Sequence, residues 1–264
     1  MYAVSRLPRR HRFQAASALM MGLGLGLCNL PAQGATVPTL VLNDANSAPF
    51  TNETGTGLID IVAGEAFRRA GLKLVLIRLP AERALLNANA GIDDGEVSRV
   101  AGIEKAYPNL VPVPEKLVDH HFVVFTRDPT LKDATWASLR PLSVGYIRGY
   151  KIVEKNIPPG TQTTAASDAT QLFTMLNKGR IDIAIYRRWE GLVLAQKLGI
   201  QNIRIVEPSL VETGVYIYLH KKHADKVPLI ASALREIKAE GLFTRTCREA
   251  FAAFQPVPSI CEAK

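Results

Sequence analysis

Short apolar segments alternate with amphipathic ones through most of the chain, and this alternation constrains the fold more than any other feature. Apolar runs predict strands over residues 39–43 and 73–78, and a more polar segment, residues 93–100, is a third strand candidate. Apolar residues at helical spacing predict helices over residues 58–70 and 81–90, each ended by a glycine. This order of strands and helices indicates βαβ units and a mostly parallel sheet.

A second α/β unit follows a long extended segment over residues 117–127. Its expected elements are strands over residues 141–147, 180–186 and 203–206 and helices over residues 149–155, 168–176 and 190–198. A second extended segment over residues 214–220 and an amphipathic helix over residues 229–240 complete the pattern.

Two extended crossings between two α/β units describe two lobes joined by a two-stranded hinge. We predict that residues 35–121 and 214–264 form lobe 1 and that residues 122–213 form lobe 2. Ligands of open α/β sheets bind beyond the carboxyl ends of the strands, so a ligand is expected in the cleft between the lobes.

The N-terminus has the pattern of a secretory signal peptide over residues 1–34. Four arginines and no acidic residue precede an apolar run over residues 13–30, and small residues follow it. The motif Ala32-x-Gly34 favours cleavage after Gly34, with Ala35 as the alternative. Export to the periplasm is therefore expected. A membrane anchor, or lipidation at Cys28, remains the alternative.

The net charge excludes one class of partner. The chain carries 32 Lys and Arg against 24 Asp and Glu, a formal net charge of +8. Loss of residues 1–34 removes four arginines, which leaves 28 basic against 24 acidic residues, or +4. No basic run with interleaved aromatic residues remains, so no nucleic-acid partner is expected. No later apolar stretch reaches 18 residues, so a soluble mature chain is expected. We also expect a monomer.

Two cysteines, Cys247 and Cys261, remain after cleavage and lie near the end of the chain. In an exported protein this spacing predicts one disulfide, and two free thiols are the alternative. No His or Cys stands beside them at ligand spacing, so no metal or cofactor is expected.

Several short motifs, in this order, resemble the bacterial extracellular solute-binding protein family 3, the polar amino-acid type. They are Pro49-Phe50, Pro80-Ala81-Glu82-Arg83, Asp94-Gly95-Glu96-Val97-Ser98-Arg99, Tyr107-Pro108, Gly145-x-x-x-Gly149-Tyr150, Gly179-Arg180-Ile181-Asp182 and Gly241-Leu242-Phe243. The Asp-Gly-Glu-x-x-Arg stretch is similar to a divergent branch. The resemblance implies an α/β, two-lobed type II periplasmic binding protein fold. It also implies a binding protein, not an enzyme, that captures a small anionic or zwitterionic solute for an ABC permease.

The chain departs from the family pattern at two places. Amino-acid binders of the family usually hold the ligand carboxylate with an Arg after a Thr-x-x-Arg turn, and this chain has no such turn. They also place an acid after a strand of the second lobe to meet the ammonium group. Here Arg187, Arg188 and Trp189 follow that strand. These departures put an ordinary α-amino acid ligand in doubt.

Arg99 is the main candidate for ligand binding, because its planar guanidinium suits a carboxylate and a strand end directs it to the cleft. Glu96 and Ser98 precede it, and a structural Arg99–Glu96 or Arg99–Asp94 pair is the alternative. Most of the other candidates for ligand binding lie near strand ends or helix starts, and some of them could instead pack in a core or face solvent. These candidates are Phe50, Arg83, Tyr146, Gly149, Tyr150, Tyr186, Arg187 and Trp189.

Two further functions remain open from the sequence. A stand-alone periplasmic sensor for a membrane receptor would have the same fold. An enzyme such as a small-acid dehydratase is the third class. His120 and His121 are adjacent, however, and would point to opposite faces of a strand, and no nucleophile motif accompanies them.

Overall fold

The computed structural model describes residues 36–262, and from Val37 onward the described chain forms one compact unit. The expected signal peptide lies outside the described residues. Among residues 36–262, no helix combines the length and the apolar character that a membrane crossing needs.

The first lobe contains three parallel strands and the helices that follow two of them. Strands β1 (Thr39–Asp44), β2 (Lys73–Arg78) and β3 (Gly95–Val100) alternate with helices α1 (Leu58–Arg69) and α2 (Ala81–Ala90). β1 lies between β2 and β3 and is parallel to both. Helix α1 buries one face, and α2 ends at Gly91 in a left-handed conformation, as the sequence predicts.

The second lobe repeats this arrangement. Its strand β6 pairs in parallel with β7 and β8, and β8 is buried along its whole length, as expected for a central strand. Its elements are β6 (Ser143–Ile147), α3 (Lys151–Asn156), β7 (Gln162–Ala166), α4 (Ala169–Asn177), β8 (Ile183–Arg187) and α5 (Arg188–Lys197).

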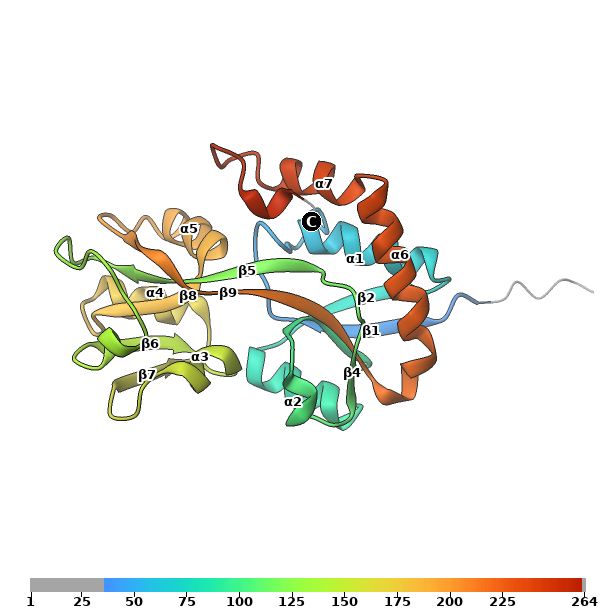
Figure 1. Cartoon of the computed structure of the whole chain (residues 1–264), viewed down its shortest axis with the longest axis horizontal. Coiled ribbons are helices and arrows are strands. Elements are labelled where there is room, and N and C mark those ends of the chain that lie inside the picture. The colour runs from blue at the N-terminus through green and yellow to red at the C-terminus, as the bar shows by residue number, and fades with distance from the viewer. Residues whose placement is uncertain (1–35, 263–264) are drawn as a thin grey trace, which may run out of the picture. The chain divides into compact units, whose positions relative to one another are not determined.

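Two long antiparallel strands belong to both lobes. β5 (Val118–Thr126) and β9 (Arg204–His220) pair along most of their length and run between the two groups of elements (Figure 1). They join all strands into one sheet of order β2-β1-β3-β9-β5-β8-β6-β7, with β4 (Leu110–Pro112) beside β9. The sequence predicts two separate strands where the structure has the single strand β9. Residues 207–213 between them contain Pro208 and several polar residues, which do not indicate a strand. It misses β4 and β7, which are short and mostly exposed or partly buried.

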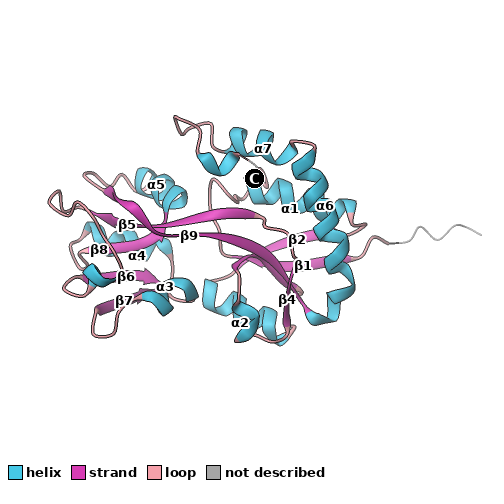
Figure 2. Cartoon of the chain, viewed as in Figure 1, coloured by secondary structure: helices cyan, strands magenta, loops and turns pink. Residues whose placement is uncertain are grey.

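The last helices return to the first lobe. α6 (Val227–Ala239) and α7 (Leu242–Ala250) lie with α1 on one face of its strands, and α2 lies on the other (Figure 2). A separate core fills the second lobe around Phe125, Phe173 and Ile185. The fold is thus the expected two-lobed α/β arrangement.

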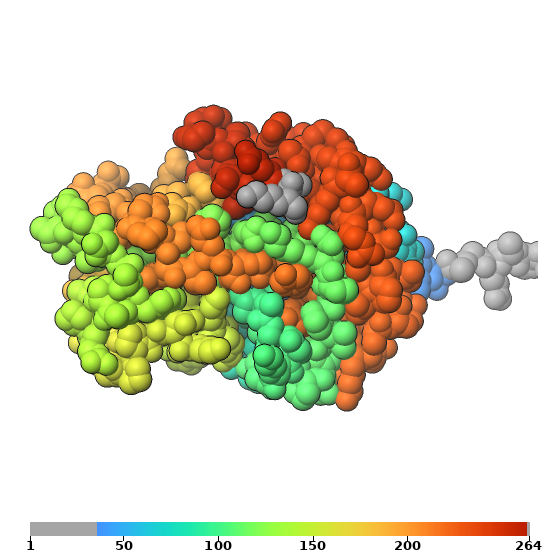
Figure 3. Space-filling model, viewed as in Figure 1, coloured from blue at the N-terminus to red at the C-terminus, as the bar shows by residue number. Residues whose placement is uncertain are grey.

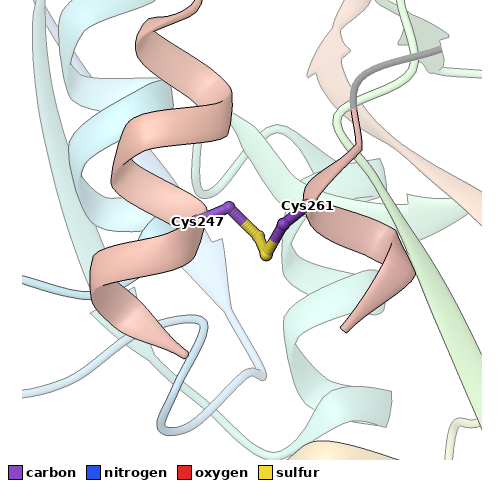
Figure 4. Close-up of a disulfide and its surroundings, with 2 residues drawn as sticks. All are labelled: Cys247 and Cys261. Atoms are coloured by element: carbon purple, nitrogen blue, oxygen red, sulfur yellow. A yellow bond between two sulfur atoms is a disulfide. The ribbon is translucent and has the colours of Figure 1, made fainter. Parts of the chain in front are cut away.

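The C-terminal segment is tied to α7 by the expected disulfide. Cys247 and Cys261 are bonded, their Cα atoms are 5.2 Å apart, and both residues are fully buried (Figure 4). Closing a loop of this size stabilises a fold by about 3 kcal/mol in the loop-entropy model.

Candidate functional site

The carboxyl ends of strands from both lobes meet across three cavities. The first lobe supplies residues 44–47, 78–81 and 98–103, and the second supplies residues 147–152, 167–170 and 186–187. In the space-filling view, the teal-green residues of the first lobe and the yellow-green residues of the second lie directly side by side (Figure 3). This is the position that the strand-end rule predicts for a ligand.

The central cavity has a volume of about 40 Å³ and brings together five of the expected site residues. Its wall is otherwise mostly apolar and includes Phe122, Ile152 and Val215. The expected residues that line it are Ser98, Arg99, Gly149, Tyr150 and Arg187.

Arg99 is buried and all of its contacts are with the protein. Its Nε and Nη2 atoms donate to both carboxylate oxygens of Glu96, one of them at 2.9 Å. Nη2 also donates to the carbonyl of Ala81, and Nη1 donates to the carbonyl of Gly149 at 3.3 Å. Since Gly149 belongs to the second lobe, Arg99 connects the two lobes. The pairing with Glu96 is one of the alternatives that the sequence leaves open.

A bulge in β3 makes this pair possible. Residues three apart on a regular strand point to opposite faces. Here Glu96 pairs with Tyr218 and Arg99 with Tyr216, so β3 advances three residues while β9 advances two. The extra residue turns Arg99 to the same side as Glu96. Burial raises the pKa of Glu96, and Arg99 opposes that rise.

Gly149 approaches the first lobe so closely that no side chain fits. Its φ is +90°, and a Cβ built there would lie 2.4 Å from the backbone N of Glu82. Glycine alone tolerates this combination without strain. Gly149 thus allows the backbones of the two lobes to approach closely.

Arg187 reaches in the opposite direction, from the second lobe to the first. Its Nη1 atom donates to Asn46 Oδ1, and Nη2 donates to the carbonyl of Ala45 at 2.7 Å. Nη2 also lies 2.8 Å from Glu190 Oε1. The guanidinium lies over the ring of Tyr150, with 5.2 Å between its central carbon and the ring centroid.

Glu190 is buried on the first turn of α5 and is poorly satisfied. Neither carboxylate oxygen has a hydrogen-bond partner among the described residues, although Arg187 is close. Burial therefore raises the pKa of Glu190 to about 7, while Arg187 opposes the rise. This carboxyl group can change its charge near neutral pH.

Two tyrosines stack beside Arg187. The rings of Tyr150 and Tyr186 are nearly parallel, with centroids 5.9 Å apart. Burial raises the pKa of both hydroxyls. Tyr150 lines both the central cavity and a second cavity, so it separates the two spaces.

His120 lies at the back of the central cavity, 2% exposed. Its Nε2 is 3.4 Å from Ser98 Oγ, and its Nδ1 has no hydrogen-bond partner among the described residues. Burial lowers its pKa well below the usual value. His121 points away to Glu212, 3.3 Å distant, as strand alternation predicts.

The second cavity, of about 340 Å³, is lined mainly by residues outside the predicted set. We call it the Asp44 cavity. Asp44 and Arg78 end strands β1 and β2, Asn46 follows β1, and Asp168 caps α4. Their position at strand ends is the signal that could have identified them. Arg78 Nε is 3.9 Å from Asp44 Oδ2, and Asp44 is 2% exposed.

The third cavity, of about 580 Å³, lies on the other side of the central one, and we call it the Lys105 cavity. Its wall is formed by residues 100–103 and 105–107, by Lys151, Ile152, Lys155 and Asn156 of α3, and by Thr213. It shares Val100, Ile103, Lys151 and Ile152 with the central cavity.

The remaining expected site residues lie elsewhere. Arg83 is exposed on α2, and Tyr146 packs against the second core. Phe50 is fully buried against His120 and Phe251, which is the core position left open as an alternative. Trp189 packs on Phe251 and Phe254 of the C-terminal segment, because the first turn of α5 directs it there. None of these four lines the three cavities.

Sequence comparison finds a relative of this chain but no matching family. No family model matches the chain. An uncharacterized protein from Shewanella oneidensis is 29% identical over 206 residues, which cover 74% of this chain and 76% of that protein.

Solved structures with a similar fold include substrate-binding proteins of amino acid ABC transporters. A mutant of ArgBP from T. maritima matches with a TM-score of 0.69 at 20% identity, over 81% of this chain and 95% of that one. The substrate-binding protein of an amino acid ABC transporter matches with a TM-score of 0.68 at 16% identity, over 81% and 99%. AbpA from Streptococcus pneumoniae, bound to L-arginine, matches with 0.67 at 14% identity, over 82% and 95%. The chain therefore has the two-lobed type II fold of the periplasmic binding proteins, as its sequence motifs imply.

Proposed function

We propose that this chain is an exported solute-binding protein that captures a small carboxylate-bearing solute between its lobes and delivers it to an ABC permease. One observation carries the proposal: strand ends of two lobes face each other across cavities, in a fold that the similar structures use for binding transported amino acids. We also propose the lobe boundaries given by the sequence, at residues 121/122 and 213/214.

Bending of β5 and β9 would open and close the cleft. These strands carry the chain between the lobes, and their pairing shifts register between Phe122 and Val124. Contacts of Arg99 with Gly149 and of Arg187 with Asn46 cross the cleft. A solute that binds both lobes would select the closed form.

The solute would contact the residues around the central cavity. In this conformation the donors of Arg99 and Arg187 are bound to protein carbonyls and side chains. As the lobes separate, an oxygen of the solute would replace the carbonyl of Gly149 or Ala45 on these guanidinium groups. Tyr150 would contribute an aromatic wall.

We infer binding rather than catalysis. Ser98 and His120 are the nearest approach to a nucleophile and base in the central cavity. Their 3.4 Å separation is long for a hydrogen bond, and no carboxylate orients the histidine among the described residues. Mass analysis of a bound solute after incubation checks this inference, and a changed mass would contradict it.

A thermal-shift screen of amino acids, dicarboxylates, sugars and small inorganic anions tests the function. A true ligand at 100 times its dissociation constant adds about 2.7 kcal/mol to the free energy of unfolding. X-ray scattering with that ligand should show a smaller radius of gyration. Tyr150→Ala should weaken binding, whereas Tyr146→Ala, within the preceding strand β6 and outside the three cavities, should not. No stabilisation by any solute, or an unchanged radius at saturation, would contradict the proposal.

A further inference from the structure

The Lys105 cavity differs from the rest of the cleft in its charge. Its ionisable side chains are three lysines, Lys105, Lys151 and Lys155, and the phenol of Tyr107. No carboxylate is among the residues that line it. Its volume of about 580 Å³ lies in the range of small-molecule sites.

Two of the three lysines are available to a ligand. Lys151 is already bound, with its Nζ 2.6 Å from Glu82 and 3.0 Å from Glu154. Lys105 and Lys155 are exposed, and neither has an ion-pair partner within 4.0 Å in the part of the chain that the structure describes. They come from different lobes, one from η1 (Ile103–Lys105) and one from α3.

The carboxylates around this space are already engaged. Glu82 and Glu154 both bind Lys151. Glu104, beside Lys105, accepts a hydrogen bond from the Tyr218 hydroxyl at 2.9 Å. An ammonium group placed here would meet the two unpaired lysines, Lys105 and Lys155, and no carboxylate among the residues that line the cavity, which is an unfavourable environment for a cation.

The rest of the wall is apolar. Val100, Ile103, Ala106 and Ile152 line the cavity, and several of them continue into the central cavity. This surface suits a short carbon chain that carries anionic groups at its end.

We infer that the cleft selects an organic anion that carries no ammonium group, such as a 2-oxo acid or a dicarboxylate, with its negative groups at Lys105 and Lys155. This inference rests on the proposed function and names its substrate class. The two lysines, one from each lobe, would then hold the same ligand and favour closure.

Matched pairs of solutes give the sharpest test. Calorimetry on the full chain would compare 2-oxoglutarate with L-glutamate and 4-methyl-2-oxopentanoate with L-leucine, plus succinate. The members of each pair differ only in an oxo or an ammonium group. We expect at least one oxo acid or succinate to bind, and each oxo acid to bind at least tenfold more tightly than its amino acid. An amino acid that binds as tightly as its oxo acid would overturn the inference.

Lysine variants locate the site. Lys105→Ala combined with Lys155→Ala should weaken binding of that anion at least tenfold, because both charges are lost. Lys178→Ala, an exposed lysine of the second lobe outside the three cavities, is the control and should leave binding unchanged. Circular dichroism confirms that the variants fold. Unchanged binding by the double variant would overturn the inference.

The outcomes separate this inference from the proposed function. If none of the 2-oxo acids or succinate binds, but the wider thermal-shift screen finds an amino acid or a neutral solute that does, the inferred substrate class is wrong and the proposed binding function stands. If no solute binds at all, both are wrong.

Discussion

Two buried arginine–glutamate pairs, one in each lobe, lie beside the cleft, and the arginine of each pair also contacts the opposite lobe. The two pairs differ in how well their polar atoms are satisfied. In each pair the residues are three apart in sequence: Glu96 and Arg99, then Arg187 and Glu190. Arg99 donates to both oxygens of Glu96. Neither oxygen of Glu190 has a hydrogen-bond partner among the described residues, and Arg187 Nε has none either.

The local backbone explains the difference. The bulge in β3 places Glu96 and Arg99 side by side on one strand, where the guanidinium can bind bidentately. Arg187 ends β8 and Glu190 lies in the first turn of α5, so the two side chains approach at an angle. The first pair therefore holds Arg99 firmly within the first lobe, and the second pair, within the second lobe, is titratable. A solute is expected to rearrange the second more readily.

The largest effect is expected from Arg99→Met. It would leave Glu96 buried without its partner, which costs about 4 kcal/mol of unfolding free energy. Denaturant unfolding measures the loss. The double variant Arg99→Met with Glu96→Gln should recover much of it, because no unpaired charge remains. A loss below about 1 kcal/mol in the single variant would contradict the view of a fixed pair.

Gly149→Ala tests the approach of the lobes beside Arg99. The new methyl group would meet the backbone of Glu82, and the residue would keep a φ of +90°. Together these should cost about 3 kcal/mol. Gly160→Ala, at a φ of +85° with nothing within 4 Å of its Cβ, is the matched control for the strain alone. Equal losses in the two variants would show that the close approach is unimportant.

Glu190→Gln tests the titratable pair. The pKa of Glu190 is about 7 in the folded chain against an ordinary value of 4.5. The folded chain therefore binds more protons between these values, so this group makes stability fall as the pH rises from about 4.5 through 7. The variant should lack this fall, worth about 2 kcal/mol, in unfolding curves at pH 5 and pH 8. The same fall in both proteins would show that Glu190 titrates normally.

The smallest effect is expected from Arg78→Ala, a third arginine beside a buried carboxylate. Its side chain is 43% exposed and its Nε is 3.9 Å from Asp44. A loose, solvated pair of this kind contributes about 0.5 kcal/mol. Thermal unfolding at low and moderate salt measures it. If Arg78→Ala lowered the free energy of unfolding as much as Arg99→Met, the distance and exposure of an arginine–carboxylate pair would not determine its contribution to stability.

Much of the fold could be predicted from the sequence. Strand β2 and helix α2 have the predicted bounds, because glycine, proline and apolar periodicity mark their ends locally. The disulfide between Cys247 and Cys261 was equally readable from spacing. β9 was not, since pairing with β5 keeps its polar middle extended.

The structure brings four of the residues predicted from strand ends, Arg99, Gly149, Tyr150 and Arg187, to one cavity. Trp189, predicted on the same ground, packs its ring on Phe251 and Phe254 instead. A spacing of a few residues gives no information on which partner a side chain will meet.

By itself the sequence determined the alternation of strands and helices, the two crossings and the disulfide, because each depends on local periodicity or on covalent chemistry. Tertiary structure alone decided what the arginines bind. The bulge that pairing with β9 produces in β3 places Arg99 beside Glu96. Contact between the two lobes places Arg187 beside the carbonyl of Ala45, more than 100 residues away in the sequence. Such partners are set by three-dimensional packing, which no local pattern records.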